Sequence, residues 1–170
     1  MHADNVLSAW IMESHDDLRA AADRTGVGFR ELSALSLLAG HENCSLEWLR
    51  PRVGLTQSGT VRLMDRLEVL GLAVRGPATA RTSRLSITPR GLEVLRAWYQ
   101  ERAAAFAHAT SGLREDQREQ LAALLDTALR NRHRTRPQAD TACRTCDWPA
   151  CGTNCPVDHS AGAGAEAREQ

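Results

Sequence analysis

The chain has 170 residues, 42% of them hydrophobic and 25% charged, so it is long enough for one domain with a buried core. Its 21 basic residues are all arginine and balance 21 acidic residues, which excludes chemistry that needs a lysine, such as a Schiff base or a phosphate-binding lysine. No apolar run approaches the length of about 18 residues that a membrane-spanning helix needs. The acidic N-terminus does not resemble a secretion signal, so we expect a cytoplasmic protein.

Hydrophobic spacing predicts two helices at the start of the chain. Residues 3–23 and 29–40 both carry apolar side chains at intervals of three or four residues. Gly26 lies just beyond the first stretch and Gly40 closes the second, as expected of residues that end helices.

The next stretch is typical of two helices joined by a tight turn. A short helix is expected from Ser45 to about Arg50, with Pro51 limiting its end. After a turn at Gly54, a second helix is expected to start at Thr56 as its N-cap and to run to Leu70, with Gly71 as its C-cap. Its buried stripe is expected to consist of Leu63, Leu67 and Leu70.

The pattern then changes to a hairpin followed by two long helices. Residues 72–75 and 84–88 are short, alternating segments typical of β-strands, with a polar connection between them. Thr88 and Pro89 predict the start of a helix that runs to about Thr110, and a last helix is expected from about Arg114 to Arg132.

This order predicts a mainly α fold with a small β-hairpin wing, in which a helix-turn-helix is followed by a hairpin. We divide the chain into a winged helix-turn-helix domain, a cysteine-rich tail and a low-complexity end that we expect to be disordered. The divisions are 1–136 for the domain, within which about 29–90 binds DNA and about 3–23 and 89–134 form dimerisation helices, 137–159 for the tail, and 160–170 for the end.

The arginines gather in the middle of the chain. Residues 50–96 contain nine arginines and only three acidic residues, so that segment carries a charge of +6 and the rest of the chain carries −6. A neutral protein with one basic segment is suited to hold a polyanion on one face. The alternative is a solvated arginine-rich surface without a partner.

The position of these arginines favours double-stranded DNA as the polyanion that the chain binds. With the leucine stripe in the core, the opposite face of the second helix shows residue types that reach base edges and phosphates in a major groove. Arginines near the hairpin tip would reach the neighbouring minor groove or backbone. The alternative is an amphipathic helix with a solvated charged face. The candidate DNA-contacting residues are Thr56, Gln57, Ser58, Thr60, Val61, Arg62, Arg66, Arg81 and Arg84.

The segment LTQSGTVRLMDRLEVLGLAVR, followed by RLSITPRGLEVL, resembles the MarR family of bacterial transcription regulators, and the similarity extends over residues 3 to about 132. The resemblance implies a homodimer whose recognition helices enter successive major grooves of a pseudo-palindromic operator. It also implies a repressor that a small-molecule effector, a metal or an oxidant releases. The chain departs from the family at Thr60 and Val61, whose types are exchanged, and at the wing tip ATARTSR, which lacks an aspartate.

A dimer is also expected from the residues themselves. The terminal helices carry more apolar surface than a connector between two DNA-binding heads needs, and two heads about 34 Å apart match one helical turn of DNA. The side chains concerned are Trp10, Leu18, Trp98, Leu121, Leu125 and Leu129.

Four of the five cysteines fall within thirteen residues, in the pattern C-x2-C-x4-C-x3-C-P. Four thiolates at such spacings can close a tetrahedral zinc site, which would fold a tail too short and polar to fold alone. The final C-x3-C-P also resembles the cluster-binding run of bacterial ferredoxins, so an iron–sulfur cluster is an alternative, as are redox-active thiols without metal and a tail with no such role. The candidate ligands are Cys143, Cys146, Cys151 and Cys155, and His159 is a substitute for one sulfur.

Other functions find less support. The chain has neither G-x-S-x-G nor H-E-x-x-H and no phosphate-binding loop, so we do not expect an enzyme. A winged-helix adaptor that binds another protein is the remaining alternative.

Cys44 is interpreted as a small buried hydrophobe rather than as a sensing thiol. An effector would bind between the terminal helices and the DNA-binding unit, where Trp10, Phe29 and Trp48 could line its site. The simpler interpretation of these three side chains is that they pack in the hydrophobic core.

Overall fold

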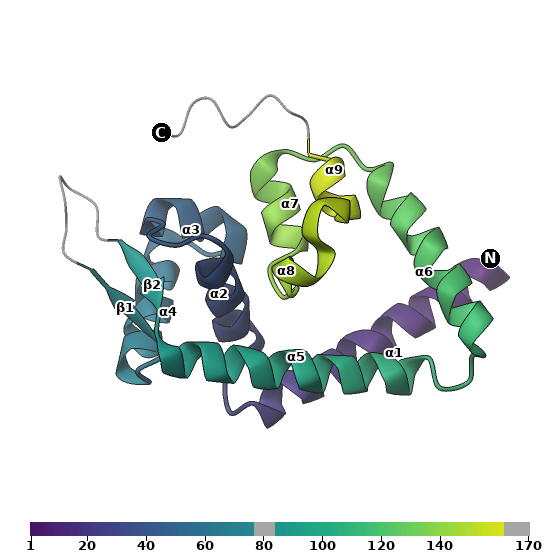
Figure 1. Ribbon diagram of the computed structural model, residues 1–170, viewed down its shortest axis with the longest axis horizontal. Helices are drawn as coiled ribbons and strands as arrows, with labels where there is room; N and C mark the ends of the chain where they lie inside the picture. Colours follow the sequence, from purple (N-terminus) through teal and green to yellow (C-terminus); the bar gives the residue numbers. More distant parts are fainter. Residues whose placement is uncertain (77–83, 162–170) are drawn as a thin grey trace.

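The computed structural model describes residues 1–76 and 84–161 of the chain. Helix α5 (Pro89–Ala109) runs along the length of the molecule and α1 (His2–Arg24) packs against it (Figure 1). A winged unit lies at one end of α5 and helix α6 (Glu115–Arg130) at the other. The other elements are α2 (Phe29–Gly40), α3 (Leu46–Val53), α4 (Gln57–Val69), β1 (Ala73–Arg75), β2 (Leu85–Ile87), α7 (Arg136–Ala142), α8 (Trp148–Cys151), the 3-10 turn η1 (Gly152–Asn154) and α9 (Pro156–His159). No helix within the described ranges is long and apolar enough to cross a membrane.

The predicted helix starts are confirmed at three caps. Ser45, Thr56 and Thr88 each accept, on the side-chain oxygen, a hydrogen bond from the backbone N–H three residues later. Each bond satisfies one of the N–H groups that a helix leaves unpaired at its first turn. These signals are local in sequence, which is why the sequence alone identifies them.

Helix α3 is longer than predicted. It continues through Pro51 to Val53, because a proline costs one backbone hydrogen bond without forbidding helical φ. The helix instead ends at Gly54, whose φ of +65° is left-handed and whose N–H donates to the carbonyl of Pro51. The prediction that Pro51 ends this helix is therefore wrong.

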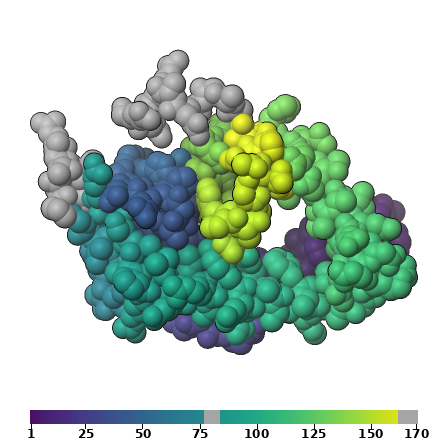
Figure 2. Space-filling view, in the orientation of Figure 1, coloured from purple at the N-terminus to yellow at the C-terminus, as the bar shows by residue number. Residues whose placement is uncertain are grey.

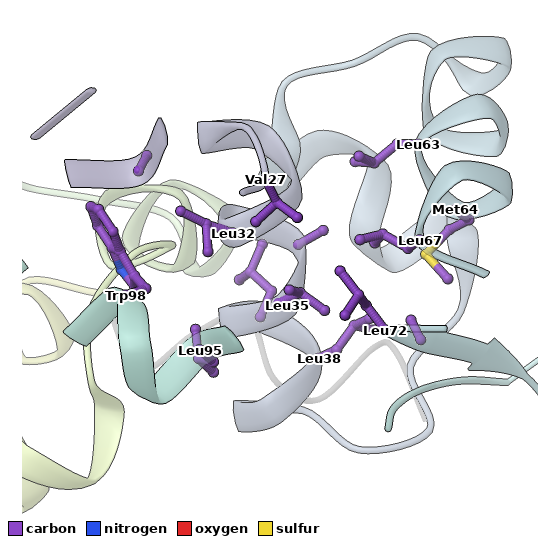
Figure 3. Close-up of a cluster of buried hydrophobic side chains, with 14 of the residues drawn as sticks. Val27, Leu32, Leu35, Leu38, Leu63, Met64, Leu67, Leu72, Leu95 and Trp98 are labelled. Atoms are coloured by element: carbon purple, nitrogen blue, oxygen red, sulfur yellow. The ribbon is translucent and has the colours of Figure 1, made fainter. Parts of the chain in front are cut away.

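The core lies around α2 (Figure 3). Every residue of α2 from Glu31 to Leu38 is buried, so this helix is enclosed on all sides. Its leucines meet Leu63 and Leu67 of α4 on one side and Trp98 of α5 on another. Helix α2 therefore fixes the position of α4 relative to α5.

The hairpin completes the winged unit. Strands β1 and β2 are antiparallel, with Val74 opposite Ser86 in the register. The N–H of Leu85 also donates to the carbonyl of Cys44, which forms an isolated bridge and ties the hairpin to the segment between α2 and α3. The fold is therefore the predicted mainly α winged helix-turn-helix.

The cysteine-rich tail contains short helices that the sequence analysis does not predict. It forms α7, α8, η1 and α9, which lie between α2 and α3 on one side and α6 on the other (Figures 1 and 2). Pro137 is at the first turn of α7, where its missing N–H costs nothing. Ser160 is buried and its carbonyl accepts from the Arg134 backbone N–H, so the prediction of disorder is wrong for residues 160 and 161. The rest of that end, 162–170, lies outside the described residues.

Candidate nucleic-acid interface and cysteine cluster

Helix α4 presents its first two turns outward. The cap at Thr56 orders the N-terminus, because its Oγ1 accepts from the Gly59 N–H at 3.2 Å. The buried face of the helix consists of Thr60, Leu63, Met64 and Leu67. The exposed side chains on the opposite face are those of Gln57, Ser58, Val61 and Arg62, all of which the sequence predicted to face DNA.

Two other predicted contacts are placed differently. Thr60 is only 1% exposed and its Oγ1 donates to the Thr56 carbonyl at 3.0 Å, so it faces the core and not outward as expected. The Nε of Arg66 lies 3.0 Å from Oε1 of Glu31, although its side chain remains largely exposed. Arg66 therefore has a carboxylate partner in the protein, whereas no ion pair is formed by Arg62 within the described ranges.

The wing is tied to α4 by one arginine. The Nη2 of Arg75 lies 2.8 Å from Oδ1 of Asp65, and its Nη1 pairs with Glu68, whose other oxygen accepts the Arg75 backbone N–H at 2.8 Å. These bonds hold β1 against the C-terminal half of the helix. Arg84 is exposed just before β2, and Arg81 lies outside the described residues.

A basic groove of about 840 Å³ runs from the N-terminus of α4 toward α1 and the start of α2. Its arginines are Arg19, Arg30, Arg62 and Arg66. Asp23 and Glu31 also line it, so cations exceed carboxylates in this groove. A phosphate backbone that passes the N-terminus of α4 would meet these arginines as well as the free N–H groups of the first turn.

The four clustered cysteines line one small cavity of about 140 Å³. Cys143 is buried, and its Sγ lies 3.9 Å from the Sγ of Cys155. Cys151 is the exposed member of the four. The exposed His159 does not line the cavity. Within the described ranges, no three His, Cys, Asp or Glu side chains already stand in the arrangement of metal ligands.

The thiols of this cluster influence one another. A hydrogen bond with Cys143, supported by the charge of Arg102 and opposed by burial, lowers the pKa of Cys146 to about 7. The same contact with Cys146, together with burial, raises the pKa of Cys143 far above the ordinary range of a thiol. Cys44 does not line this cavity, and burial raises its pKa to about 11, which fits the predicted role as a small hydrophobe and not a reactive thiol.

A second cavity, of about 460 Å³, lies where the sequence placed an effector. It is bounded by α2, α5 and the start of α8, and Tyr99 and Trp148 are its aromatic walls. Neither Trp10, Phe29 nor Trp48 lines it; Phe29 packs edge-on against Trp98 with ring centres 5.8 Å apart. Sequence reasoning missed Tyr99, because the contact that places it against the tail joins residues 47 positions apart.

Solved structures share this architecture. The YusO protein of Bacillus subtilis is 23% identical with a TM-score of 0.68, over 76% of this chain and 94% of that one. A MarR-family transcriptional regulator from a Rhodococcus species is 23% identical with a TM-score of 0.60, over 75% and 94%. A MarR-family protein of Mycobacterium tuberculosis in complex with DNA is 18% identical with a TM-score of 0.64, over 74% and 95%. The same Mycobacterium protein in complex with salicylic acid is 19% identical with a TM-score of 0.59, over 72% and 93%.

Comparisons with models of protein families and with curated proteins give no match. The structural similarity nevertheless extends over about three quarters of this chain and nearly the whole length of each solved chain, so it is not confined to the winged unit. The chain therefore has the winged helix-turn-helix fold of the MarR-family transcription regulators.

Proposed function

We propose that this chain is a DNA-binding transcription regulator that acts as a homodimer and represses by occupying a pseudo-palindromic operator. The observation that carries the proposal is the outward face of α4, where Gln57, Ser58 and Arg62 are exposed beside the wing while the leucines behind them are buried. Amide, hydroxyl and guanidinium groups at the start of a helix can donate to base edges and phosphates in a major groove.

The distribution of charge also supports DNA binding at the outward face of α4. The groove beside α4 gathers four arginines, and the segment 50–96 carries a charge of +6 in a chain with no net charge. Phosphate neutralisation gives binding that weakens steeply with salt. A MarR-family protein with this fold is known in complex with DNA, which supports extending the same role to this chain.

The dimer is supported by apolar surface at the end of the molecule far from the wing. Helix α6 has no buried residue in one protomer, although it is 16 residues long and amphipathic. A helix of this kind gains most of its stability from packing an apolar face. The exposed apolar side chains on α1, the end of α5 and α6 are those of Val6, Leu7, Ile11, Met12, Phe106, Leu124 and Leu125. A second copy of the chain would bury them.

An effector would modulate this activity from the cavity between α2, α5 and α8. Its walls combine apolar side chains of α5 with the Arg96 guanidinium and the Asp147 carboxylate, so a small aromatic molecule with polar groups fits its chemistry. A MarR-family protein with this fold is known in complex with salicylic acid, which favours ligands of that class.

The proposal is tested by sequencing the DNA fragments that the purified protein retains from its own genome. A duplex recovered in this way should bind more tightly than a scrambled duplex, and the logarithm of the affinity should fall linearly with the logarithm of the salt concentration. Arg62→Ala should weaken binding by about 1–3 kcal/mol. Arg132→Ala, at an exposed position after α6, is the matched control and should leave binding unchanged. Equal binding of both duplexes, or binding that salt and Arg62→Ala do not affect, would instead favour a protein–protein adaptor.

A further inference from the structure

The tail brings four sulfurs from separate elements into one place. Cys143 follows α7, Cys146 lies in the next turn, Cys151 ends α8 and Cys155 precedes α9, yet all four line the same cavity of about 140 Å³. Two of them, twelve residues apart in sequence, have their Sγ atoms 3.9 Å apart. We propose that these four cysteines bind one Zn²⁺ ion and that the loaded site holds the tail against the winged unit.

The sulfur spacing favours a single ion over a four-iron cluster. Two thiolates that each lie about 2.3 Å from one tetrahedral zinc ion are about 3.8 Å apart. The separation of Cys143 and Cys155 matches this value. In a four-iron cluster each cysteine binds a different iron, which sets the sulfurs farther apart and needs room for the inorganic sulfides.

Closing the site requires small movements of exposed segments. Cys143 already approaches both Cys155 and Cys146, so Cys151 is the cysteine that must turn farthest toward the others. Cys151 is exposed at the end of a four-residue helix, and the Gly152 that follows it has a left-handed φ of +51°. The movement of Cys151 therefore disturbs no packed side chain.

The charges around the cavity suit a zinc–thiolate centre. On binding, the four thiols release their protons to solvent, and Zn²⁺ with four thiolates carries a net charge of −2. Arg136 and Asp158 line the cavity and pair with each other, and Arg102 lies near Cys146. Arg102 has no carboxylate partner within the described residues, so a negative centre beside it would complete its pairing.

The turn that carries the first two cysteines is bound directly by α2 and α5. The Cys146 carbonyl accepts from the Ser36 hydroxyl at 2.9 Å and from the Tyr99 hydroxyl at 3.2 Å. The Thr145 carbonyl accepts from Nε1 of Trp98 at 3.0 Å and from Arg102 at 2.6 Å. The carbonyls of Thr145 and Cys146 thus each accept two hydrogen bonds from side chains of α2 and α5. These bonds can form only while the turn keeps its shape.

Zinc at this site would therefore act on DNA binding. Helix α2 sets the position of α4, and α5 connects the winged unit to the proposed dimer interface, so the docked turn fixes the two heads relative to each other. This regulation rests on the proposed function, whereas zinc binding itself does not. Loss of zinc should lower the affinity for the operator roughly tenfold, a value typical of coupling between two sites.

The metal is tested first, without DNA. The full-length protein should contain one zinc per chain, and Co²⁺ in its place should give the visible absorption of a tetrahedral thiolate site. Cys143→Ser and Cys151→Ser should each weaken zinc binding at least a hundredfold in a chelator competition, while Cys44→Ser should not. Cys151 is the decisive position, because its exposed sulfur has no packing role and Cys151→Ser should lower the Tm only if a metal is lost.

Three results would overturn the zinc proposal: iron and inorganic sulfide in brown, anaerobically purified protein; disulfides among the four thiols of freshly prepared protein; or a Cys151→Ser variant with unchanged zinc content and Tm. The regulatory part is tested by adding a chelator to the protein–operator complex and then restoring zinc. If the affinity for the operator is the same with and without zinc, the coupling between zinc and DNA binding is refuted, but the proposal of a zinc site stands. Absence of operator binding by zinc-loaded protein refutes the proposed function instead.

Discussion

Arg52 of α3 and Asp140 of α7 form an ion pair that is almost completely buried, with Nε 2.7 Å from Oδ2 and side-chain exposures of 3% and 1%. The same guanidinium donates to the Trp48 carbonyl and lies over the Trp48 ring, and Arg136 donates to the second carboxylate oxygen of Asp140. The pair joins the cysteine-rich tail to the helix that precedes the turn into α4.

Asp140→Ala should destabilise the protein strongly. The substitution leaves the Arg52 charge buried without its partner, which costs about 3–5 kcal/mol in the free energy of unfolding. The measurement is urea denaturation near pH 7. Glu47→Ala is the matched control, because it removes an ion pair with Arg50 at 2.6 Å that is exposed to solvent and should cost less than about 1 kcal/mol. Equal losses for the two variants would show that the tail does not depend on the buried pair.

Gly91→Ala should also destabilise the chain, for a steric reason. A Cβ at Gly91 would fall inside the contact distance of the Leu72 carbonyl oxygen and 2.7 Å from Cγ1 of Ile87, so α5 would have to move away from the wing. We expect a loss of at least about 1–3 kcal/mol, as for overpacked cores. Gly112→Ala is the control, since nothing lies within 4 Å of a Cβ there. Thermal denaturation of both variants distinguishes the two sites, and a Gly91→Ala Tm equal to that of Gly112→Ala would contradict the close approach.

The stability of the chain should fall in mild acid because of His41. Burial lowers the pKa of this imidazole below its ordinary value of 6.5; Asp140 raises it in part, and Arg52 and Arg136 lower it. Nε2 of His41 is buried without a hydrogen-bond partner among the described residues. Below pH 6.5 the unfolded chain therefore binds a proton on this ring more readily than the folded chain does, so the free energy of unfolding decreases as the pH falls.

His41→Gln removes this proton-binding group. The variant should be less stable overall, because it loses the contacts of the ring with Trp48 and Trp148, whose centres lie 4.5 and 4.9 Å away. Its Tm should nevertheless change less than that of the wild type between about pH 7.5 and 5.5, a window that spans the ordinary histidine pKa. His133→Gln, at an exposed position, is the control. Parallel slopes for the wild type and His41→Gln would refute the role of His41.

The sequence predicts the winged unit well because its signals are local. Ser45, Thr56 and Thr88 cap helices within three residues of themselves, and the leucines of α4 repeat at the helical period. Thr60 shows the limit of this reasoning. A threonine at that position is polar, but its hydroxyl is satisfied by a carbonyl one turn earlier, so the residue faces the core at little cost while Val61 faces solvent.

The tail could not be predicted in the same way. Helix α7 has only seven residues, too few to be stable alone, and it is held by Arg52, which lies 88 positions earlier in the sequence. The carbonyls of Thr145 and Cys146 are likewise held by side chains of α2 and α5. The cysteine spacing predicts that four thiols meet, but these long-range partners decide where they meet.

Leu124→Glu should dissociate the proposed dimer. Leu124 is 69% exposed on α6, in a helix with no buried residue, so a carboxylate there costs a single protomer little and prevents a second protomer from covering the face. Sedimentation at micromolar concentration should give a dimer mass for the wild type and a monomer mass for the variant. Val69→Glu is the matched control, because Val69 is 87% exposed on α4. The monomeric variant should bind the operator weakly, since each head then contacts only a half-site. A wild-type protein that sediments as a monomer would refute the proposed dimer, and a Leu124→Glu variant that remains a dimer would place this apolar face outside the dimer interface.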